Sequence, residues 1–268
     1  MREVIVAGVL IAVLSGCAGG GGEQVMGTTG ARQETTTGQE TTTGQETTAG
    51  VEAGVLKGRV VDAAGRPIAG AEIVADNQFL HNSNLVVMTD ADGRYRVSTN
   101  VATATFQVSG TVTRRFEGRV YTMQLTPHDD TSFAGPTGAV RDFTWRLTGE
   151  RSDGLGFYGS LVLFNMDVWD LPNPDDYLRE EDVTLTLTPQ GPLIDGSAGE
   201  VITRRAERTA DGPGLTDIPI GRYRITAESL GRPLRIRLRD TGEYAEAVVT
   251  VFERFLTTSH RIELDLKP

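Results

Sequence analysis

Apolar and polar residues alternate along the chain from residue 54 onward. Between residues 55 and 61, Leu56 and Val60 fall on one side of an extended chain, while Lys57 and Arg59 fall on the other. This period of two is typical of a half-buried β-strand, because successive side chains of a strand point to opposite faces of its sheet. The segment is therefore expected to be a strand with one face in a hydrophobic core.

Two turn-forming segments follow this strand. Residues 62–67 contain a glycine and a proline and precede a second alternating run at 71–75, which predicts a hairpin with the first strand. Residues 90–93 read Asp-Ala-Asp-Gly and precede a further alternating run at 94–98. The two aspartates also resemble calcium ligands, but a turn needs the same residues for side-chain-to-backbone hydrogen bonds.

Similar runs continue to the C-terminus. The segment 99–148 is expected to complete a first module with strands near 106–109 and 143–147, and 149–268 is expected to form a second module. Strands of the second module are predicted near 157–166, 183–188, 200–204, 222–228, 234–239, 245–252 and 260–266. No 3.6-residue pattern is long enough to predict a helix. Short strands at this spacing predict an all-β fold with two β-sandwich modules.

The first module also resembles a known family. The residues that carry the resemblance are Gly58, Val60, Asp62, Gly65, Pro67, Ile68, Gly70, Ala71 and Ile73, followed by Thr89, Asp90, Asp92, Gly93 and Tyr95. Their spacing resembles the carboxypeptidase regulatory-like domain, over about residues 55–148. The resemblance implies a transthyretin-like sandwich of the prealbumin type and a place in the cell envelope. It implies no catalytic activity, since in peptidases this domain accompanies a separate catalytic domain. A shorter likeness to prealbumin-like strand entries lies at 215–225.

An export signal is expected at residues 1–16. Arg2 supplies a positive charge, and the apolar run 4–14 is shorter than the roughly 20 residues that span a bilayer. Residues 14–17 read Leu-Ser-Gly-Cys and resemble a bacterial lipobox, which implies cleavage before Cys17 and attachment of palmitate or a similar lipid to it. Two or three acyl chains would anchor the chain stably. The alternative is an ordinary secretory signal with an incidental cysteine.

Residues 17–54 are expected to form a disordered tether behind the lipidated cysteine. TTTGQE occurs at 35–40 and again at 41–46, and residues 18–54 contain five glutamates, one arginine and no aromatic residue. Such a segment buries too little apolar surface to offset the entropy lost on ordering. As a flexible coil it would span roughly 30–35 Å and act as a spacer. O-glycosylation of its threonines is the alternative role.

The chain carries a net charge of −10, and much of the excess lies between residues 165 and 182, where seven acidic residues accompany one arginine. The candidate ligand loop within this segment consists of Asp167, Trp169, Asp170, Asp175, Asp176 and Tyr177. Carboxylates can coordinate Ca²⁺, and exposed aromatic rings can stack on a sugar. The acids lack the regular spacing of a calcium loop. A solvated loop, a surface for a partner or glycan, and a Ca²⁺ site remain the three interpretations.

Motifs for catalysis or metal binding are not apparent. The three histidines, at 81, 128 and 260, show neither His-x-x-Glu nor His-x-His spacing. His128, Asp129 and Asp130 are consecutive, and three consecutive positions seldom converge on one ion. The zinc-peptidase motif, the nucleophile elbow and the phosphate loop are absent. Cys17 is the only cysteine and cannot form an internal disulfide. We therefore expect no metal, no cofactor and no enzymatic activity.

Three arginines, at 235, 237 and 239, alternate along one predicted strand and would share one of its faces. They form either a solvated face or a surface for an anionic polymer. The acidic total argues against nucleic acid.

These patterns together predict a non-catalytic, membrane-anchored lipoprotein of the bacterial cell envelope, facing the periplasm or the exterior. Its β-sandwich modules would bind or scaffold an envelope protein or a glycan. The alternative is a carbohydrate-binding module that uses the loop 169–177. An unrecognised hydrolase with a carboxylate pair is a third hypothesis.

Overall fold

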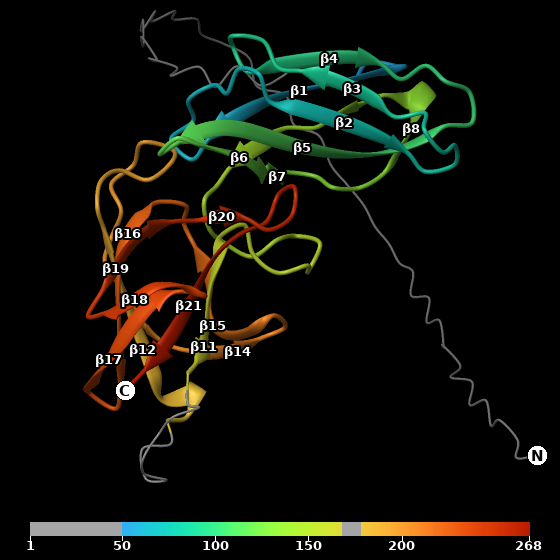
Figure 1. Ribbon diagram of the computed structural model, residues 1–268. Helices are drawn as coiled ribbons and strands as arrows, with labels where there is room; N and C mark the ends of the chain where they lie inside the picture. The colour runs from blue at the N-terminus through green and yellow to red at the C-terminus, as the bar shows by residue number, and fades with distance from the viewer. Residues whose placement is uncertain (1–49, 168–177) are drawn as a thin grey trace, which may run out of the picture. The chain divides into compact units, whose positions relative to one another are not determined.

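The computed structural model describes residues 50–167 and 178–268, and Figure 1 labels most of its strands. The expectations for the signal segment, for Cys17 and for residues 18–49 of the tether concern residues outside these ranges. The same is true of most of the predicted ligand loop. Its members outside the described residues are Trp169, Asp170, Asp175, Asp176 and Tyr177.

Strands make up nearly all regular structure in the described part of the chain. The helical segments assigned there are the short 3-10 turns Gly135–Thr137 and Glu180–Asp182. Within the two described ranges, no helix combines the length and the apolar character that crossing a bilayer requires. The prediction of an all-β fold built from sandwich-like sheets is confirmed.

Strands β1–β10 form two sheets, coloured blue to yellow-green in Figure 1. The first sheet has the order β4 (Arg94–Ser98), β1 (Val55–Asp62), β10 (Phe143–Trp145) and β7 (Thr126–Pro127), with β9 (Ala139–Val140) also paired to β1. The second has the order β3 (Leu85–Met88), β2 (Glu72–Asn77), β5 (Thr105–Phe116) and β6 (Arg119–Gln124), with β8 (Phe133–Ala134) also paired to β5. We call these two sheets the N-terminal sandwich. Val60, Ile73 and Phe106 are among its buried core residues.

The hairpin predicted between the first two strands is wrong, because β1 and β2 belong to different sheets. The connection instead crosses from one sheet to the other. The backbone N of Ile68 donates to the carbonyl of Val60 at 3.0 Å, and the backbone N of Gly70 donates to the carbonyl of Thr89 at 3.0 Å. β2 pairs with β3 and β5, which follow it in the chain. The local pattern therefore predicted both strands but not their partners.

The Asp-Ala-Asp-Gly segment forms the predicted turn. Oδ1 of Asp90 accepts hydrogen bonds from the backbone N of Asp92 at 2.9 Å and of Arg94 at 2.8 Å. Gly93 has a φ of +71°, and a Cβ there would lie 2.4 Å from the carbonyl oxygen of Val60. The Asp90 carboxylate and the glycine thus both serve the turn.

A close approach of backbone segments explains a second glycine of the family-like pattern. A Cβ at Gly58 would lie 1.8 Å from the carbonyl oxygen of Arg141 and 2.8 Å from the hydroxyl of Tyr95. The Tyr95 hydroxyl donates a buried hydrogen bond to that same carbonyl. Burial raises the pKa of Tyr95 well above its ordinary value, so the hydroxyl remains a donor at physiological pH. Gly58 therefore leaves the space in which β1, β4 and the Arg141 segment meet.

Strands β11–β21 form one extended sheet, which we call the C-terminal sandwich (yellow to red in Figure 1). Its order is β13 (Ile202–Arg205), β12 (Val183–Pro189), β16 (Arg222–Ser229), β17 (Arg232–Leu238), β21 (His260–Lys267), β11 (Ser160–Met166), β15 (Gly212–Ile218) and β14 (Glu207–Thr209). The remaining strands are β18 (Thr241–Ala245) on β17, β19 (Val248–Val251) on β16, and β20 (Glu253–Arg254) on β21. The predicted strands are present, but the sequence pattern did not predict β14, β15, β18 or β20.

The two ends of this strand order are joined by one residue. β13 and β14 flank Ala206, whose backbone N donates to the carbonyl of Val183 at 2.7 Å. One nearly continuous segment thus pairs with β12 before Ala206 and with β15 after it. This change of partner folds the sheet back on itself and covers edges that would otherwise be free to pair with another chain.

β6 of the N-terminal sandwich contacts the segment that precedes β21. The Tyr121 hydroxyl donates to the carbonyl of Phe252 at 2.8 Å, and its ring centroid lies 5.0 Å from that of His260. Arg119 forms an ion pair with Glu253. His260 is only 2% exposed, and its Nε2 has no hydrogen-bond partner.

The buried His260 makes folding sensitive to mild acid. Burial, assisted by the positive charge of Arg254, lowers the pKa of His260 from about 6.5 to about 4. The unfolded chain therefore binds one more proton than the folded chain between these two pH values. The resulting stability is present above pH 6.5 and is lost as the pH falls to 4, by up to roughly 3 kcal/mol.

We predict that His260→Phe flattens the dependence of unfolding free energy on pH between 7 and 4, relative to the unmodified protein. Phenylalanine keeps the contact with Tyr121 and removes the titrating group. Urea unfolding at several pH values measures the effect, and His81→Phe, at an exposed histidine, serves as the control. Parallel pH profiles for His260→Phe and the unmodified protein would contradict this prediction.

Candidate functional site

A gap in strand pairing defines the candidate site. On one edge, β5 pairs with β8 at residues 105–106 and with β6 at residues 111–116. Among the described residues, no strand pairs with 107–109 on that edge, and the carbonyl of Gly110 accepts from the backbone N of Leu125 at 2.9 Å. A cleft of about 300 Å³ opens here, so side chains and backbone of an interrupted sheet edge are accessible to a ligand.

Polar and apolar groups both line this cleft. The polar lining includes Asp76, Gln107, Ser109, Gln124 and Asp130 from the N-terminal sandwich, and Arg151, Asp153 and Tyr158 from the following loop. Val108, Leu125 and Phe143 add apolar surface. Amides, hydroxyls and carboxylates around a partly apolar pocket suit a ligand rich in hydrogen-bonding groups. The three carboxylates outnumber the single guanidinium, so the cleft is acidic.

The loop 149–158 supplies one wall of the cleft. Nε of Arg151 donates to Oδ1 of Asp153 at 3.0 Å, and the guanidinium lies 5.9 Å from the centroid of the Tyr158 ring. The backbone N atoms of Gly149 and Gly159 donate to the carboxylate of Asp217 at distances of 2.9 to 3.0 Å. These bonds at its two ends fix the loop against the C-terminal sandwich.

The pairing with Arg151 also sets the charge state of this wall. Hydrogen bonds from Arg151 lower the pKa of Asp153 to about 2. At neutral pH the Asp153 side chain is therefore a carboxylate that accepts hydrogen bonds and does not donate a proton.

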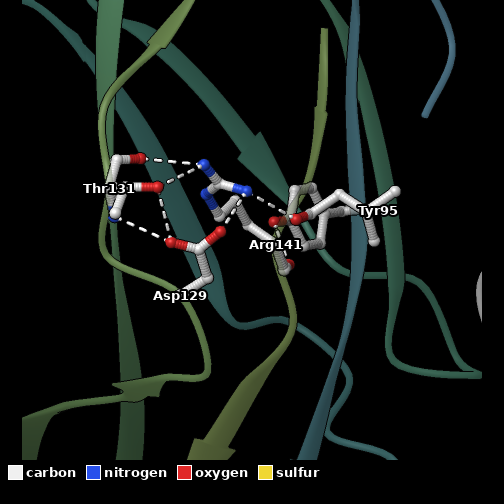
Figure 2. A network of polar contacts seen from close by, with 5 residues as sticks. Tyr95, Asp129, Thr131 and Arg141 are labelled. Carbon is white, nitrogen blue, oxygen red and sulfur yellow. Dashed lines mark hydrogen bonds and ion pairs between the residues drawn. The ribbon is translucent and has the colours of Figure 1, made fainter. Parts of the chain in front are cut away.

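A polar network around Arg141, drawn in Figure 2, fixes the segment next to Asp130, which lines the cleft. Nη1 of Arg141 lies 2.8 Å from Oδ2 of Asp129, and Nη2 donates to the carbonyl of Thr131 at 2.8 Å. Oδ1 of Asp129 accepts hydrogen bonds from the hydroxyl of Thr131 at 2.6 Å and from its backbone N at 2.9 Å. The bonds from Thr131 and the charge of Arg141 lower the pKa of Asp129. The Arg141 guanidinium also lies over the Phe133 ring.

This network separates three residues that are consecutive in sequence. His128 bonds through Nε2 to the hydroxyl of Thr144 at 2.8 Å, whereas Asp129 faces Arg141 and Asp130 lines the cleft. They do not converge on a common point. In the described ranges, no group of three or more histidine, cysteine or acidic side chains could hold a metal ion.

Asp167 is the one member of the predicted ligand loop that the structure describes. Its carboxylate accepts a hydrogen bond from the Tyr244 hydroxyl at 2.8 Å. Its backbone N donates to the carbonyl of Leu266 at 2.7 Å. Asp167 thus ties the end of β11 to β18 and β21, and the ligand role of the loop remains a prediction.

The arginine row at 235, 237 and 239, in β17 and directly after it, is partly neutralised. Arg237 lies 3.0 Å from the carboxylate of Asp265, and Arg239 lies 2.6 Å from that of Glu263. Arg235 donates to the carbonyl of Tyr244 at 2.8 Å.

Sequence reasoning did not find the cleft at β5. Its polar residues come from segments between 76 and 158, and no short motif contains them. The available local signal was the polar loop 127–136, whose residues Asp129 and Asp130 were considered only as metal ligands.

Comparison with known proteins supports the expectation for the first module. Residues 55–133 match the family described as the carboxypeptidase regulatory-like domain. A search of curated proteins found no significant match to the chain.

Several solved structures show low similarity to the chain. The TIE protein of Bacillus anthracis has a TM-score of 0.33 and 13% identity, over 80% of this chain and 34% of that one. A streptococcal ancillary pilin has a TM-score of 0.24 and 10% identity, over 80% and 62%. A B repeat unit of the collagen binding surface protein of Staphylococcus aureus has a TM-score of 0.21 and 11% identity, over 82% and 100%. The chain spans less than two thirds of the first two, and similarity at this level does not assign a function.

We predict that Asp129→Asn lowers the free energy of unfolding by roughly 1 kcal/mol, because it weakens charge-assisted bonds to Arg141 and Thr131. Asp130→Asn, at the adjacent residue that lines the cleft, should leave stability unchanged. Urea unfolding of the two variants measures the difference. Equal stabilities of the two variants would show that the network does not hold this loop.

Proposed function

We propose that this chain is a non-catalytic, lipid-anchored protein of the bacterial cell surface, and that its β-sandwich unit binds a partner through the cleft at β5. The observation that carries the binding role is the interruption in strand pairing at residues 107–109, beside which a cleft of about 300 Å³ with polar and apolar lining opens. An interrupted edge offers backbone and side-chain hydrogen-bonding groups together.

The anchoring part of the proposal is supported by the sequence. The apolar run 4–14 is followed by Leu-Ser-Gly-Cys, and the polar spacer to residue 54 separates Cys17 from β1. A lipid on Cys17 would hold the protein at a membrane surface, and the spacer would place the cleft beyond the lipid headgroups.

The chemistry of the cleft favours binding over catalysis. The carboxylate of Asp153 is engaged by Arg151, and that of the neighbouring Asp129 is engaged by Thr131 and Arg141. Both carboxyl groups have lowered pKa values, which suits hydrogen-bond acceptors and not general acids. The regulatory-like family of residues 55–133 agrees with an accessory role.

Two modules, at 55–148 and 149–268, remain part of the proposal. Strand pairing supports this division, since β1–β10 pair only with one another in the described chain, as do β11–β21.

Carbohydrate binding is the second candidate function. The amides of Gln107 and Gln124, the carboxylate of Asp130 and the ring of Tyr158 line one cleft, and these are groups that bind sugar hydroxyls and sugar faces. The loop 169–177, proposed from the sequence for this role, would then be an additional contact.

The proposal is tested with the full chain produced in a bacterium that lipidates its proteins. We expect the protein in the membrane fraction, and Cys17→Ser should release it. Gln107→Ala with Tyr158→Ala should weaken binding to an envelope glycan or protein at least about tenfold, because several hydrogen bonds and a stacking surface are lost. Gln190→Ala, at an amide in the C-terminal sandwich, is the matched control.

Glycan arrays and pulldown from envelope extract provide the two readouts. Membrane attachment that survives Cys17→Ser would refute the anchor. Binding that survives the double substitution at Gln107 and Tyr158 would refute the cleft.

A further inference from the structure

A second cleft of about 300 Å³ opens on the C-terminal sandwich, between β17, β20 and β21. Three arginines, Arg239, Arg254 and Arg261, line it together with Glu253, Phe255 and Glu263. Glu253 is paired with Arg119 of β6. Three guanidiniums are therefore balanced only by the carboxylate of Glu263. The cleft is positive although the net charge of the whole chain is −10.

The two best-placed guanidiniums share a single acceptor. Nη1 of Arg239 lies 2.6 Å from Oε1 of Glu263, and Nη2 of Arg261 lies 3.1 Å from the same oxygen. The side chains of Arg239, Arg261 and Glu263 are between 22% and 28% exposed, so solvent screens their charges less than at an open surface. One carboxylate neutralises one of the two cations, which leaves an excess positive charge in a partly enclosed space.

Packing holds these groups in place. The Arg261 guanidinium lies 3.6 Å from the centroid of the Phe255 ring, a cation–π arrangement that restricts its rotation. Phe255 is fixed by the turn 255–259, in which its backbone N donates to the carbonyl of Ser259 at 2.9 Å. The cleft is thus preorganised, which lowers the entropy cost of binding a ligand there.

Hydrogen bonding in the cleft is incomplete. Nε of Arg239 is buried and has no acceptor, although a guanidinium offers five donors. A buried donor without a partner destabilises the protein. Each Nη atom carries two N–H groups, so Arg239 and Arg261 retain Nη donors beyond those that reach Glu263, and these can bond to acceptor oxygens of a ligand in the cleft.

We propose that this cleft binds a phosphate ester. A phosphate group carries between one and two negative charges and three acceptor oxygens, which matches three guanidiniums and one carboxylate better than a single carboxylate ligand does. The volume accommodates one phosphorylated unit. The overall negative charge of the chain repels long polyanions, so an isolated phosphate ester is favoured over nucleic acid.

The experiment uses the full chain with Cys17→Ser, so that its own anchor does not obscure binding to vesicles. Isothermal titration calorimetry at low salt measures binding of glycerol 1-phosphate, inorganic phosphate and acetate. Sedimentation with vesicles of phosphatidylglycerol and phosphatidylcholine, compared with phosphatidylcholine alone, tests a lipid headgroup as the source of the phosphate. Soluble ester binding without vesicle binding identifies a soluble ligand, and binding of both identifies an accessible lipid headgroup.

Three substitutions make the result specific. Arg261→Gln should weaken phosphate-ester binding roughly tenfold or more, because it removes one charge-assisted contact. Glu263→Gln removes the competing carboxylate and should strengthen binding several-fold. This gain cannot arise from a folding defect. Arg235→Gln, on the neighbouring strand β17 and outside the cleft, should leave binding unchanged.

Failure of glycerol 1-phosphate to bind at millimolar concentration would overturn the proposal. Binding that is unaffected by both Arg261→Gln and Glu263→Gln would do so as well, as would acetate binding as tightly as the phosphate ester. The result is independent of the cleft at β5, since none of these substitutions touches it.

Discussion

The hydrogen bond from the Tyr95 hydroxyl to the carbonyl of Arg141 is the constraint on which the N-terminal sandwich depends. It links β4 to the segment between β9 and β10, and the missing side chain of Gly58 in β1 leaves room for it. Because the Arg141 backbone is fixed in this way, its guanidinium is positioned to hold Asp129 and Thr131. One buried contact thus connects the pairing of the first sheet to the shape of a surface loop.

The clefts at β5 and at β21 follow from where strands end. β6 ends at Gln124, after which Leu125 still bonds to the carbonyl of Gly110, and β8 covers only residues 105–106 of β5, so the edge at 107–109 is left open. β20 pairs only briefly with β21, which leaves space beside Arg261. The first cleft is acidic and the second is basic. The described chain therefore has two clefts of opposite charge.

Much of the strand content could be predicted from alternation, but pairing and clefts could not. The runs at 55–61 and 71–75 are strands, yet their partners lie up to 83 residues away, as in the pairing of Val60 with Phe143, and local spacing does not encode such distances. β15 was missed because its first residues are Gly-Pro-Gly, which predict a turn. Asp167 was predicted as a ligand, but its carboxylate bonds to Tyr244, 77 residues away. The turn at Asp90 was predicted correctly because its bonds span four residues at most.

The most direct test of this account is the effect of Tyr95→Phe on the full chain, measured by urea unfolding and by hydrogen exchange. Loss of the hydroxyl leaves the Arg141 carbonyl unsatisfied, so the free energy of unfolding should fall by roughly 1–2 kcal/mol. Backbone amides of 128–131 should exchange faster than in the unmodified protein. The amides of β16 should keep the same relative order of exchange rates among themselves. Tyr158→Phe, at the cleft, is the control. Unchanged stability together with unchanged exchange at 128–131 would contradict the central role of this contact.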